Sequence, residues 1–298
     1  MIDKKEFLFP FPDVRKSQQA LILEVDKAVK EKKHIIVHAP TGIGKTVATL
    51  SPALAYALHH QKTVFFLTSK HTQHRIALET LKHIEEVYPN KIKVIDLIGK
   101  KHLCLFTDTT KTSSSEFTEY CRLVREQNQC DFFLNLKTKG SPSLATKQTL
   151  NYLDKIRSVQ EVMGFSKTTR VCPYEILHLG ARKANVIIAD YYHLLNPSIY
   201  ESFKKRTGKT LEDAIIILDE AHNLPERCRE LLTATLSTIT IERAMKEMQK
   251  HDIHEFLFDV KKIIDTATPI NTLFFSILYN KIIMLKYYLK VVKENLII

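Results

Sequence analysis

A short glycine-containing loop constrains this chain more than any other feature. Residues 42–46 read Gly-Ile-Gly-Lys-Thr, and they follow the apolar run 35–37 and precede a helix-compatible stretch from Thr46 to His60. The apolar run is typical of a buried parallel strand. A strand, a tight loop and a helix in this order place backbone N–H groups and the positive end of a helix dipole around an anion. The sequence therefore predicts an α/β fold with a phosphate-binding loop.

This loop offers a specific set of groups to a nucleotide. Lys45 is placed to reach the β- and γ-phosphates, and the hydroxyl of Thr46 is placed to bind Mg²⁺. Glycine at two loop positions lets the backbone approach the anion closely. A fortuitous Gly-Lys-Thr in a surface turn is the alternative, and the order of strand, loop and helix argues against it. The predicted phosphate-binding residues are Ala39, Pro40, Thr41, Gly42, Ile43, Gly44, Lys45 and Thr46.

A second apolar run, residues 215–218, is followed directly by two acidic residues. Asp219 is predicted to hold Mg²⁺, and Glu220 to orient and deprotonate the attacking water. An acidic surface loop after a strand is the alternative interpretation, but it leaves the upstream loop unexplained. Lys45, Asp219 and Glu220 are therefore the predicted catalytic residues of a site for ATP and Mg²⁺.

These two segments resemble the Walker A motif and the DEAH box of superfamily 2 helicases. Residues 9–12 with Arg15 and Gln18 resemble the family's adenine-reading segment, whose Gln amide can pair with both edges of adenine. The resemblance implies a RecA-like P-loop NTPase domain with a mostly parallel sheet. It also implies that His222 reports the state of the nucleotide to the DNA-binding surface.

Two further segments resemble the XPD/DinG branch of these helicases. Residues 67–73 are similar to a motif that contacts the DNA backbone, although Ser69 stands where the family usually has Arg. Residues 184–195 are similar to the segment that precedes the DEAH strand, with Asp190 where relatives often have Asn. The resemblance implies ATP hydrolysis coupled to translocation along single-stranded DNA, duplex unwinding and a role in DNA repair.

Four of the five cysteines lie between the two nucleotide motifs, in the spacing C-x16-C-x8-C-x41-C. The chain start, residues 1–12, lacks the apolar core of a secretory signal, so structural disulfides are not expected. The spacing alone leaves zinc, an iron–sulfur cluster and unrelated buried thiols open. These four cysteines are Cys104, Cys121, Cys130 and Cys172.

The layout of these cysteines is similar to that of the XPD-like helicases, which implies that they bind a [4Fe–4S] cluster in an inserted domain. Cys228 follows the DEAH box and is not predicted to be a ligand. The insert is polar, and its Ser/Thr-rich part, Thr107 to Thr118, is predicted to be a loop. The cluster is expected to fix a set of basic side chains around a pore or wedge: Lys100, Lys101, Arg122, Arg125, Lys137 and Lys139.

The charge of the chain is consistent with a nucleic-acid partner. It carries 44 basic and 33 acidic side chains, a net charge of +11. An excess of this kind binds phosphates without reading sequence, although lysine-rich faces also occur on proteins that are merely soluble. Four aromatic side chains are candidates for base stacking, but several of them are expected in the core instead: Phe132, Phe133, Tyr191 and Tyr192. The predicted partners are single-stranded and forked or duplex DNA, and no membrane.

The resemblance divides the chain into four parts. Residues 1–98 and 176–238 are predicted to form the first motor domain, residues 99–175 the inserted cluster domain, and residues 239–298 the start of a helical arch-like insert. No second motor domain, which supplies arginines to the γ-phosphate, is visible. The chain is therefore expected to be the N-terminal half of a helicase that lacks activity alone, with the second half as a possible partner chain.

Two rival functions are considered beside this one. The first is a non-motor DNA-binding module with a vestigial ATP site and a structural metal cluster. The second is a nuclease, which would need a further carboxylate constellation that the sequence does not offer. The apolar tail, 272–298, is interrupted by Lys281 and is too short to span a bilayer. It is predicted to form either a buried helical hairpin or a face that binds a partner. The expected location is the cytoplasm, or the nucleus of a eukaryote.

Overall fold

The computed structural model describes residues 2–40, 42–89, 92–233, 246 and 296–297. The chain divides into two compact units, and the first comprises Met1–Leu224 together with Lys290–Ile298. The second unit, Pro225–Leu289, contains most of helix α11 (Leu224–Leu232). Everything that follows concerns the first unit unless the second is named.

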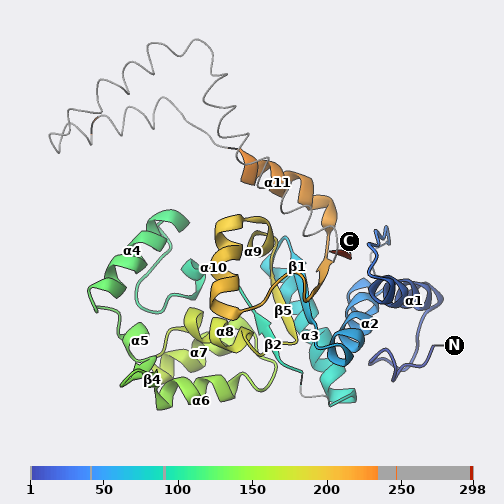
Figure 1. Cartoon of the computed structure of the whole chain (residues 1–298), viewed down its shortest axis with the longest axis horizontal. Coiled ribbons are helices and arrows are strands. Elements are labelled where there is room, and N and C mark those ends of the chain that lie inside the picture. The colour runs from blue at the N-terminus through green and yellow to red at the C-terminus, as the bar shows by residue number, and fades with distance from the viewer. Residues whose placement is uncertain (1, 41, 90–91, 234–245, 247–295, 298) are drawn as a thin grey trace, which may run out of the picture. The chain divides into compact units, whose positions relative to one another are not determined.

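A five-stranded sheet in the order β2-β5-β1-β6-β7 forms the centre of the first unit (Figure 1). Every strand pair in it is parallel. The carboxyl ends of the central strands lie level, because Thr68 is paired with Asp190 and Leu67 with Leu218. The predicted α/β fold with a parallel sheet is confirmed. The strands are β1 (Thr63–Thr68), β2 (Val94–Asp96), β5 (Val186–Asp190), β6 (Ala214–Leu218) and β7 (Leu296–Ile297).

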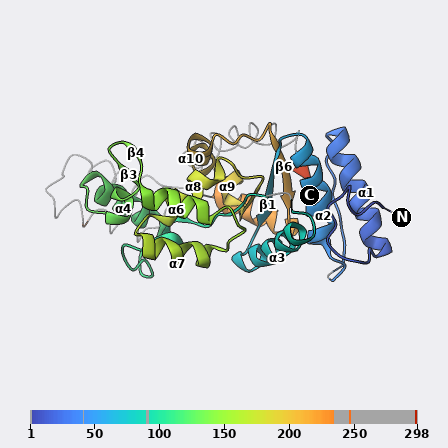
Figure 2. The same ribbon diagram turned by 90° about the horizontal axis from the view of Figure 1, so that it is seen from below.

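Helices cover both faces of this sheet (Figures 1 and 2). On one face, Phe66 belongs to a buried apolar cluster shared with the first three helices. On the other face, the ring of Phe65 packs edge-on against Phe203 of α10 at 5.8 Å. Burying each such side chain contributes about 1.5–3 kcal/mol. The covering helices are α1 (Lys16–Glu31), α2 (Lys45–His59), α3 (His71–Val87), α8 (Pro173–Ala181), α9 (Tyr192–Leu195) and α10 (Pro197–Thr207).

The segment between β2 and β5 leaves the sheet and forms a group of short helices beyond α8 (Figure 2). It returns through α8, which packs so closely that a Cβ at Gly180 would lie 2.9 Å from Ile95 and 2.8 Å from Leu153. Its elements are η1 (Lys100–Leu103), α4 (Ser114–Glu126), α5 (Asp131–Leu134), β3 (Lys137–Thr138), β4 (Ser141–Pro142), α6 (Leu144–Tyr152) and α7 (Val159–Thr169).

Three sequence predictions about local structure are wrong. The run 35–37 forms only an isolated bridge at Ile35, and Ile36 is 79% exposed. Both edges of β6 are already paired, with β1 and with β7, so the run has no place beside it. The end of the predicted tail hairpin, Leu296–Ile297, is instead strand β7, and the rest of that hairpin lies outside the described residues.

The predicted loop 107–118 also ends earlier than expected. Helix α4 begins at Ser114 because the hydroxyl of Ser113 accepts the backbone N–H of Glu116, whose carboxylate accepts the N–H of Ser113 in return. Most of the predicted arch-like segment, 239–298, lies outside the described residues. The division into four parts stays a prediction.

Candidate nucleotide site and cysteine cavity

The loop before α2 has a backbone suited to wrapping an anion. Gly42 has φ of 82° and Gly44 has φ of 81°, values that favour glycine. A Cβ at Gly44 would lie 2.4 Å from the amide nitrogen of Gln18, so a larger residue would also displace that side chain. Within the described residues, no side chain caps α2 and no acidic residue lies in its first turn. Its first N–H groups are therefore left for an anion.

The other predicted phosphate-binding residues lie around this turn. Ala39, Pro40 and Ile43 belong to the loop, whereas Lys45 and Thr46 begin α2. Thr41 lies outside the described residues. The structure thus brings the described members of the predicted set together at one helix end.

The predicted adenine-reading residues contact the same loop. The Nη1 of Arg15 donates to the carbonyl oxygen of Gly42 at 2.9 Å. Gln18 is buried, and its Oε1 accepts the backbone N–H of Arg15 at 3.0 Å. Gln18 therefore caps α1 and supports the loop, and its pairing with adenine stays a prediction.

The acidic pair meets the loop at the carboxyl edge of the sheet. The backbone N–H of Asp219 donates to the carbonyl of Leu67 at 2.9 Å, which extends the β1–β6 ladder beyond Leu218. The Nζ of Lys45 lies 3.8 Å from Oε1 of Glu220 and donates to the carbonyl of Ala39 at 3.2 Å. Two segments that are far apart in the sequence therefore converge, as the predicted magnesium-nucleotide site requires.

The electrostatics of the acidic pair favour a cation. Burial raises the pKa of Asp219, and the carboxylate of Glu220 raises it further, whereas Lys45 lowers it. A divalent ion would stabilise the ionised form of Asp219 against both of these costs. His222 is exposed, with its Nδ1 at 3.3 Å from Oε2 of Glu220.

The segment that resembles a DNA-contacting motif lies at the same edge of the sheet. The hydroxyl of Thr68 donates to the carbonyl of Lys70 at 3.1 Å, and α3 begins at His71. The Nε2 of His71 lies 3.7 Å from Oδ2 of Asp190. This interaction with Asp190 raises the pKa of His71, although burial opposes it.

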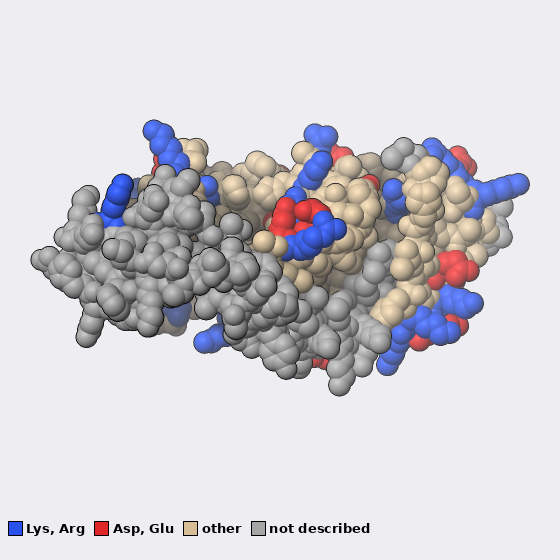
Figure 3. All heavy atoms as spheres, turned by 90° about the horizontal axis from the view of Figure 1, so that it is seen from above, with Lys and Arg blue, Asp and Glu red and all other residues tan. Residues whose placement is uncertain are grey.

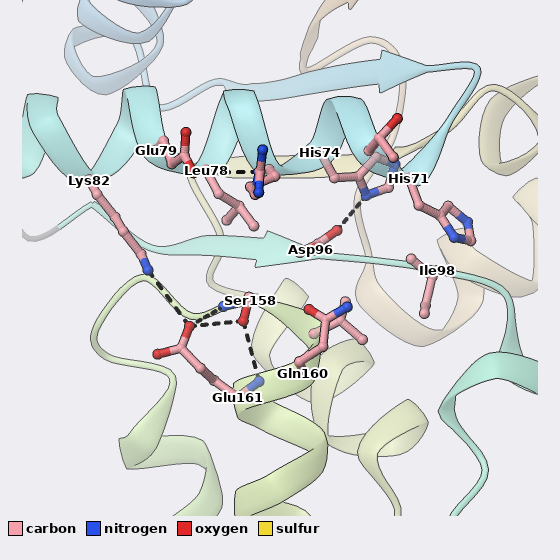
Figure 4. A pocket seen from close by; sticks show the side chains of 13 residues that line it. His71, His74, Leu78, Glu79, Lys82, Asp96, Ile98, Ser158, Gln160 and Glu161 are labelled. Atoms are coloured by element: carbon pink, nitrogen blue, oxygen red, sulfur yellow. Dashed lines mark hydrogen bonds and ion pairs between the residues drawn. The ribbon is translucent and has the colours of Figure 1, made fainter.

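A cavity of about 630 Å³ lies beside this segment, between α3, the end of β2 and the start of α7 (Figure 4). Its charged side chains are paired with one another. The Nδ1 of His74 lies 2.6 Å from Asp96, and Lys82 lies 3.6 Å from Glu161 (Figure 4). Acidic side chains therefore stand among the basic ones that line this cavity, so it is not a purely basic surface for a DNA backbone.

All four predicted cluster ligands line one cavity in the insert. Each comes from a different element: Cys104 follows η1, Cys121 lies on α4, and Cys130 and Cys172 precede α5 and α8. Burial raises the pKa of the Cys172 thiol to about 12, and Cys130 adds to the shift. Burial also raises the pKa of Cys130, with contributions from Cys121 and Cys104, so the four thiols are neighbours.

Basic and aromatic side chains surround these thiols. Arg125 lies 3.7 Å from the ring centre of Phe133, and its Nη1 donates to Oε1 of Glu175 at 3.2 Å. The Nη1 of Arg206 donates to the other oxygen of Glu175 at 2.8 Å. One carboxylate on α8 therefore joins α4 of the insert to α10 against the sheet.

Several of the predicted DNA-facing groups have other partners. Arg122 pairs with Glu119 and Glu126 on its own helix, and Arg125 pairs with Glu175. On the face seen in Figure 3, the described basic side chains occur at separate places with acidic ones among them. Tyr191 is buried and is unavailable to a base.

The described part of the chain offers neither a site for a single metal ion nor a membrane-spanning helix. Among those residues, no three His, Cys, Asp or Glu side chains stand close enough together to hold a metal ion. None of the described helices combines the length and the apolar character needed to cross a bilayer.

A family comparison decides the relationship of this chain. The DEAD_2 family matches residues 66–241, which is more than half of the chain. The chain belongs to the DEAD_2 family. Together with the XPD relatives and the XPD structure described next, this match confirms the predicted relationship to XPD-like superfamily 2 helicases.

Curated DEAD_2 relatives extend this finding. The general transcription and DNA repair factor IIH helicase subunit XPD/RAD3 of Saccharomyces cerevisiae is 26% identical over 88% of this chain and 35% of its own length. The probable ATP-dependent helicase MJ0942 of Methanocaldococcus jannaschii is 29% identical over 82% of this chain and 33% of its own length. The chain spans about a third of the length of these relatives.

A solved structure described as "XPD_Helicase" supports the fold of this DEAD_2 chain. It matches with a TM-score of 0.59 at 24% identity, over 96% of this chain and 49% of that one.

Sequence reasoning missed one residue of the nucleotide site. The hydroxyl of Tyr191 donates to the carbonyl oxygen of Asp219. Its place directly after β5, beside the end of β1, was the available signal, because the carboxyl ends of neighbouring parallel strands meet at one edge.

Proposed function

We propose that this chain is the ATP-binding half of an XPD-like DNA helicase. The observation that carries the proposal is the approach of Lys45, at the start of α2, to Glu220, in the turn after β6, with 3.8 Å between Nζ and Oε1. The complete enzyme would couple ATP hydrolysis to movement along single-stranded DNA and to the opening of forked or duplex DNA. The names of the relatives, which include helicases and a DNA repair subunit, support this activity.

The residues of the site take distinct roles in this proposal. Lys45 and the loop N–H groups bind the β- and γ-phosphates. Thr46 and Asp219 bind Mg²⁺, and Glu220 orients and deprotonates the attacking water. Arg15 and Gln18 hold the adenine end, and His222 connects the acidic pair to the DNA-binding surface.

We also propose that the thiols of the insert bind a [4Fe–4S] cluster, although the described side chains do not stand close enough together to hold a single metal ion. Four cysteines from four separate elements line one cavity, which matches the four thiolates that such a cluster requires. Cys104, Cys121, Cys130 and Cys172 would hold it, and its role would be to join the insert's short elements. The bound iron would also favour the ionised thiolates that burial alone disfavours.

The partners follow from the same proposal. The net charge of +11 supports binding to the DNA backbone. The second motor domain, in the same protein or as a separate chain, would complete the nucleotide site with its arginines. Hydrolysis by the 298-residue chain alone is expected to be slower by about a thousandfold, because such arginines contribute on that scale. DNA as substrate implies the cytoplasm, or the nucleus of a eukaryote, as the place of action.

Nucleotide binding by a Lys45→Ala variant tests the proposal. Removing a charged hydrogen-bond donor from the phosphates should weaken binding of a fluorescent ATP analogue in Mg²⁺ by about 10- to 100-fold. Lys62→Ala is the matched control, because Lys62 pairs with Asp213 at the opposite edge of the sheet. Equal binding by Lys45→Ala and the wild-type chain would contradict the ATP site. Tight DNA binding without nucleotide binding would instead favour a non-motor binding module.

A further inference from the structure

The turn that carries the acidic pair is restrained from two sides. Glu220 has φ of 55° and ψ of 42°, a left-handed conformation that a residue other than glycine keeps only when its surroundings hold it. On one side, the N–H of Asp219 bonds to Leu67 at 2.9 Å. On the other, the backbone N–H and the side-chain amide of Asn223 both donate to the carbonyl of Glu220 at 3.0 Å.

Tyr191 adds a restraint from a different strand. It follows the last residue of β5, and its hydroxyl reaches the turn after β6, although β1 lies between these two strands in the sheet. Its hydroxyl donates to the carbonyl oxygen of Asp219, which belongs to the peptide between Asp219 and Glu220. A bond to this peptide restrains both carboxylates at once.

The backbone of Tyr191 is itself fixed at the end of β1. Its N–H donates to the carbonyl of Thr68 at 3.2 Å, one position beyond the Thr68–Asp190 pair. The ring is 1% exposed, which leaves little room for the hydroxyl to move. Tyr191 is thus held by two buried strands, β5 and β1, and it restrains the turn after β6.

We propose that Tyr191 is a positioning residue for ATP hydrolysis. By fixing the Asp219–Glu220 peptide, its hydroxyl aims the Asp219 carboxylate at Mg²⁺ and the Glu220 carboxylate at the attacking water. The inference rests on the proposed function, since it assigns a role within the same site. If the ring served only to pack, phenylalanine would replace it without loss, so the hydroxyl is the group to test.

The test compares nucleotide affinity with and without metal in the full chain. Binding of fluorescent ADP is measured in Mg²⁺ and in EDTA, and the ratio of the two affinities gives the contribution of the metal. Tyr191→Phe should lower this ratio about fivefold, the usual scale for one lost hydrogen bond, and leave metal-free binding unchanged. Tyr200→Phe is the control, because Tyr200 is also buried but lies on α10, and it should leave the ratio and the metal-free affinity unchanged. Asp219→Asn should remove the contribution of the metal, so that the ratio falls to about one, and it serves as the reference.

The outcomes separate this inference from the proposed function. If Asp219→Asn lowers the ratio but Tyr191→Phe does not, the inference is overturned and the site stands. An equal loss of binding with and without metal, or an unfolded Tyr191→Phe variant, would mean that the hydroxyl acts only on the fold, which also overturns it. If the wild-type chain gains nothing from Mg²⁺, or Asp219→Asn keeps the ratio, the magnesium site fails and the inference falls with it.

Discussion

The nucleotide site and the cysteine cavity rest on different kinds of support. The acidic pair follows a strand whose five residues are all buried, next to another strand with six buried residues. The cysteines lie instead on or beside short helices, and α5, which follows Cys130, has no buried residue of its own. The acidic pair is held by a sheet, whereas three of the four cysteines lie on or beside elements with few buried residues, namely η1, α4 and α5.

This difference indicates what each site needs from its ligand. Strand ladders fix the acidic pair before any nucleotide binds, so the geometry of this pair is expected to persist without one. Short elements with few buried side chains gain less from burial, and a bound metal centre is the usual device that offsets the entropy of ordering them. We therefore expect the insert, and not the sheet, to depend on its ligand for folding.

The largest expected effect is the loss of an ordered insert when a cluster ligand is removed. The wild-type protein, purified without oxygen, should be brown and contain about four iron and four sulfide per chain. Cys130→Ser should lose this content and become sensitive to limited proteolysis within residues 99–175. Nucleotide affinity should stay within about twofold, because the sheet keeps its own hydrogen bonds.

Cys228→Ser is the matched control, because Cys228 belongs to α11 and is not a predicted ligand. It should keep the iron and the protease resistance. A colourless wild-type protein with one zinc ion would refute the cluster. Loss of nucleotide binding together with the insert would refute the independence of the two regions.

The sequence indicated which residues come together better than it indicated the helices and strands that hold them. Apolar runs identified the central strands, because a parallel sheet is covered on both faces and its strands are apolar along their length. The same logic failed at 35–37, because an apolar run does not reveal which strand edge is free to receive it. The edge beside β6 is taken by Leu296–Ile297, a long-range pairing without a local signal.

In the insert, the error is that a helix forms where the sequence analysis predicted a loop. Its polar composition suggested a loop where α4 begins, although Ser113 and Glu116 carry a capping signature that the sequence displays. The contact of Tyr191 with Asp219 depends on the order of strands in the sheet, which composition cannot give. Short-range signals such as a helix cap can therefore be recognised in the sequence, whereas contacts between distant segments cannot.

An acid titration addresses α8, the helix through which the insert returns to the sheet. His178 is buried, and this burial lowers its pKa to about 4. The unfolded chain has the ordinary histidine pKa near 6.5, so below that pH the unfolded state takes up the proton first. Stability is thus fully present above about pH 6.5 and falls towards pH 4, by about 3 kcal/mol in total.

Thermal unfolding from pH 7.5 to 4.5 measures this effect. His178→Gln, which cannot titrate, should lose less stability in acid than the wild-type chain does. His59→Gln, at an exposed position on α2, should follow the wild-type curve. Parallel curves for His178→Gln and the wild-type chain would show that the histidine does not carry the acid sensitivity of this junction.

The smallest expected effect concerns the carboxylate that joins the two regions. Glu175 accepts Arg125 of the insert at 3.2 Å and Arg206 of α10 at 2.8 Å, and its side chain is 14% exposed. Glu175→Gln removes the charge, keeps the shape and leaves two guanidinium groups without a counter-charge. We expect the unfolding free energy to fall by about 1–2 kcal/mol, less than for a fully buried pair because both arginines are partly hydrated. Glu119→Gln, which alters an exposed ion pair within α4, should cause no measurable change.

Measured together with nucleotide affinity, Glu175→Gln sharpens the contrast between the two sites. If the junction only holds the insert in place, stability falls and nucleotide binding does not, whereas a matching loss of nucleotide affinity would mean that the cysteine region supports the sheet site through this carboxylate.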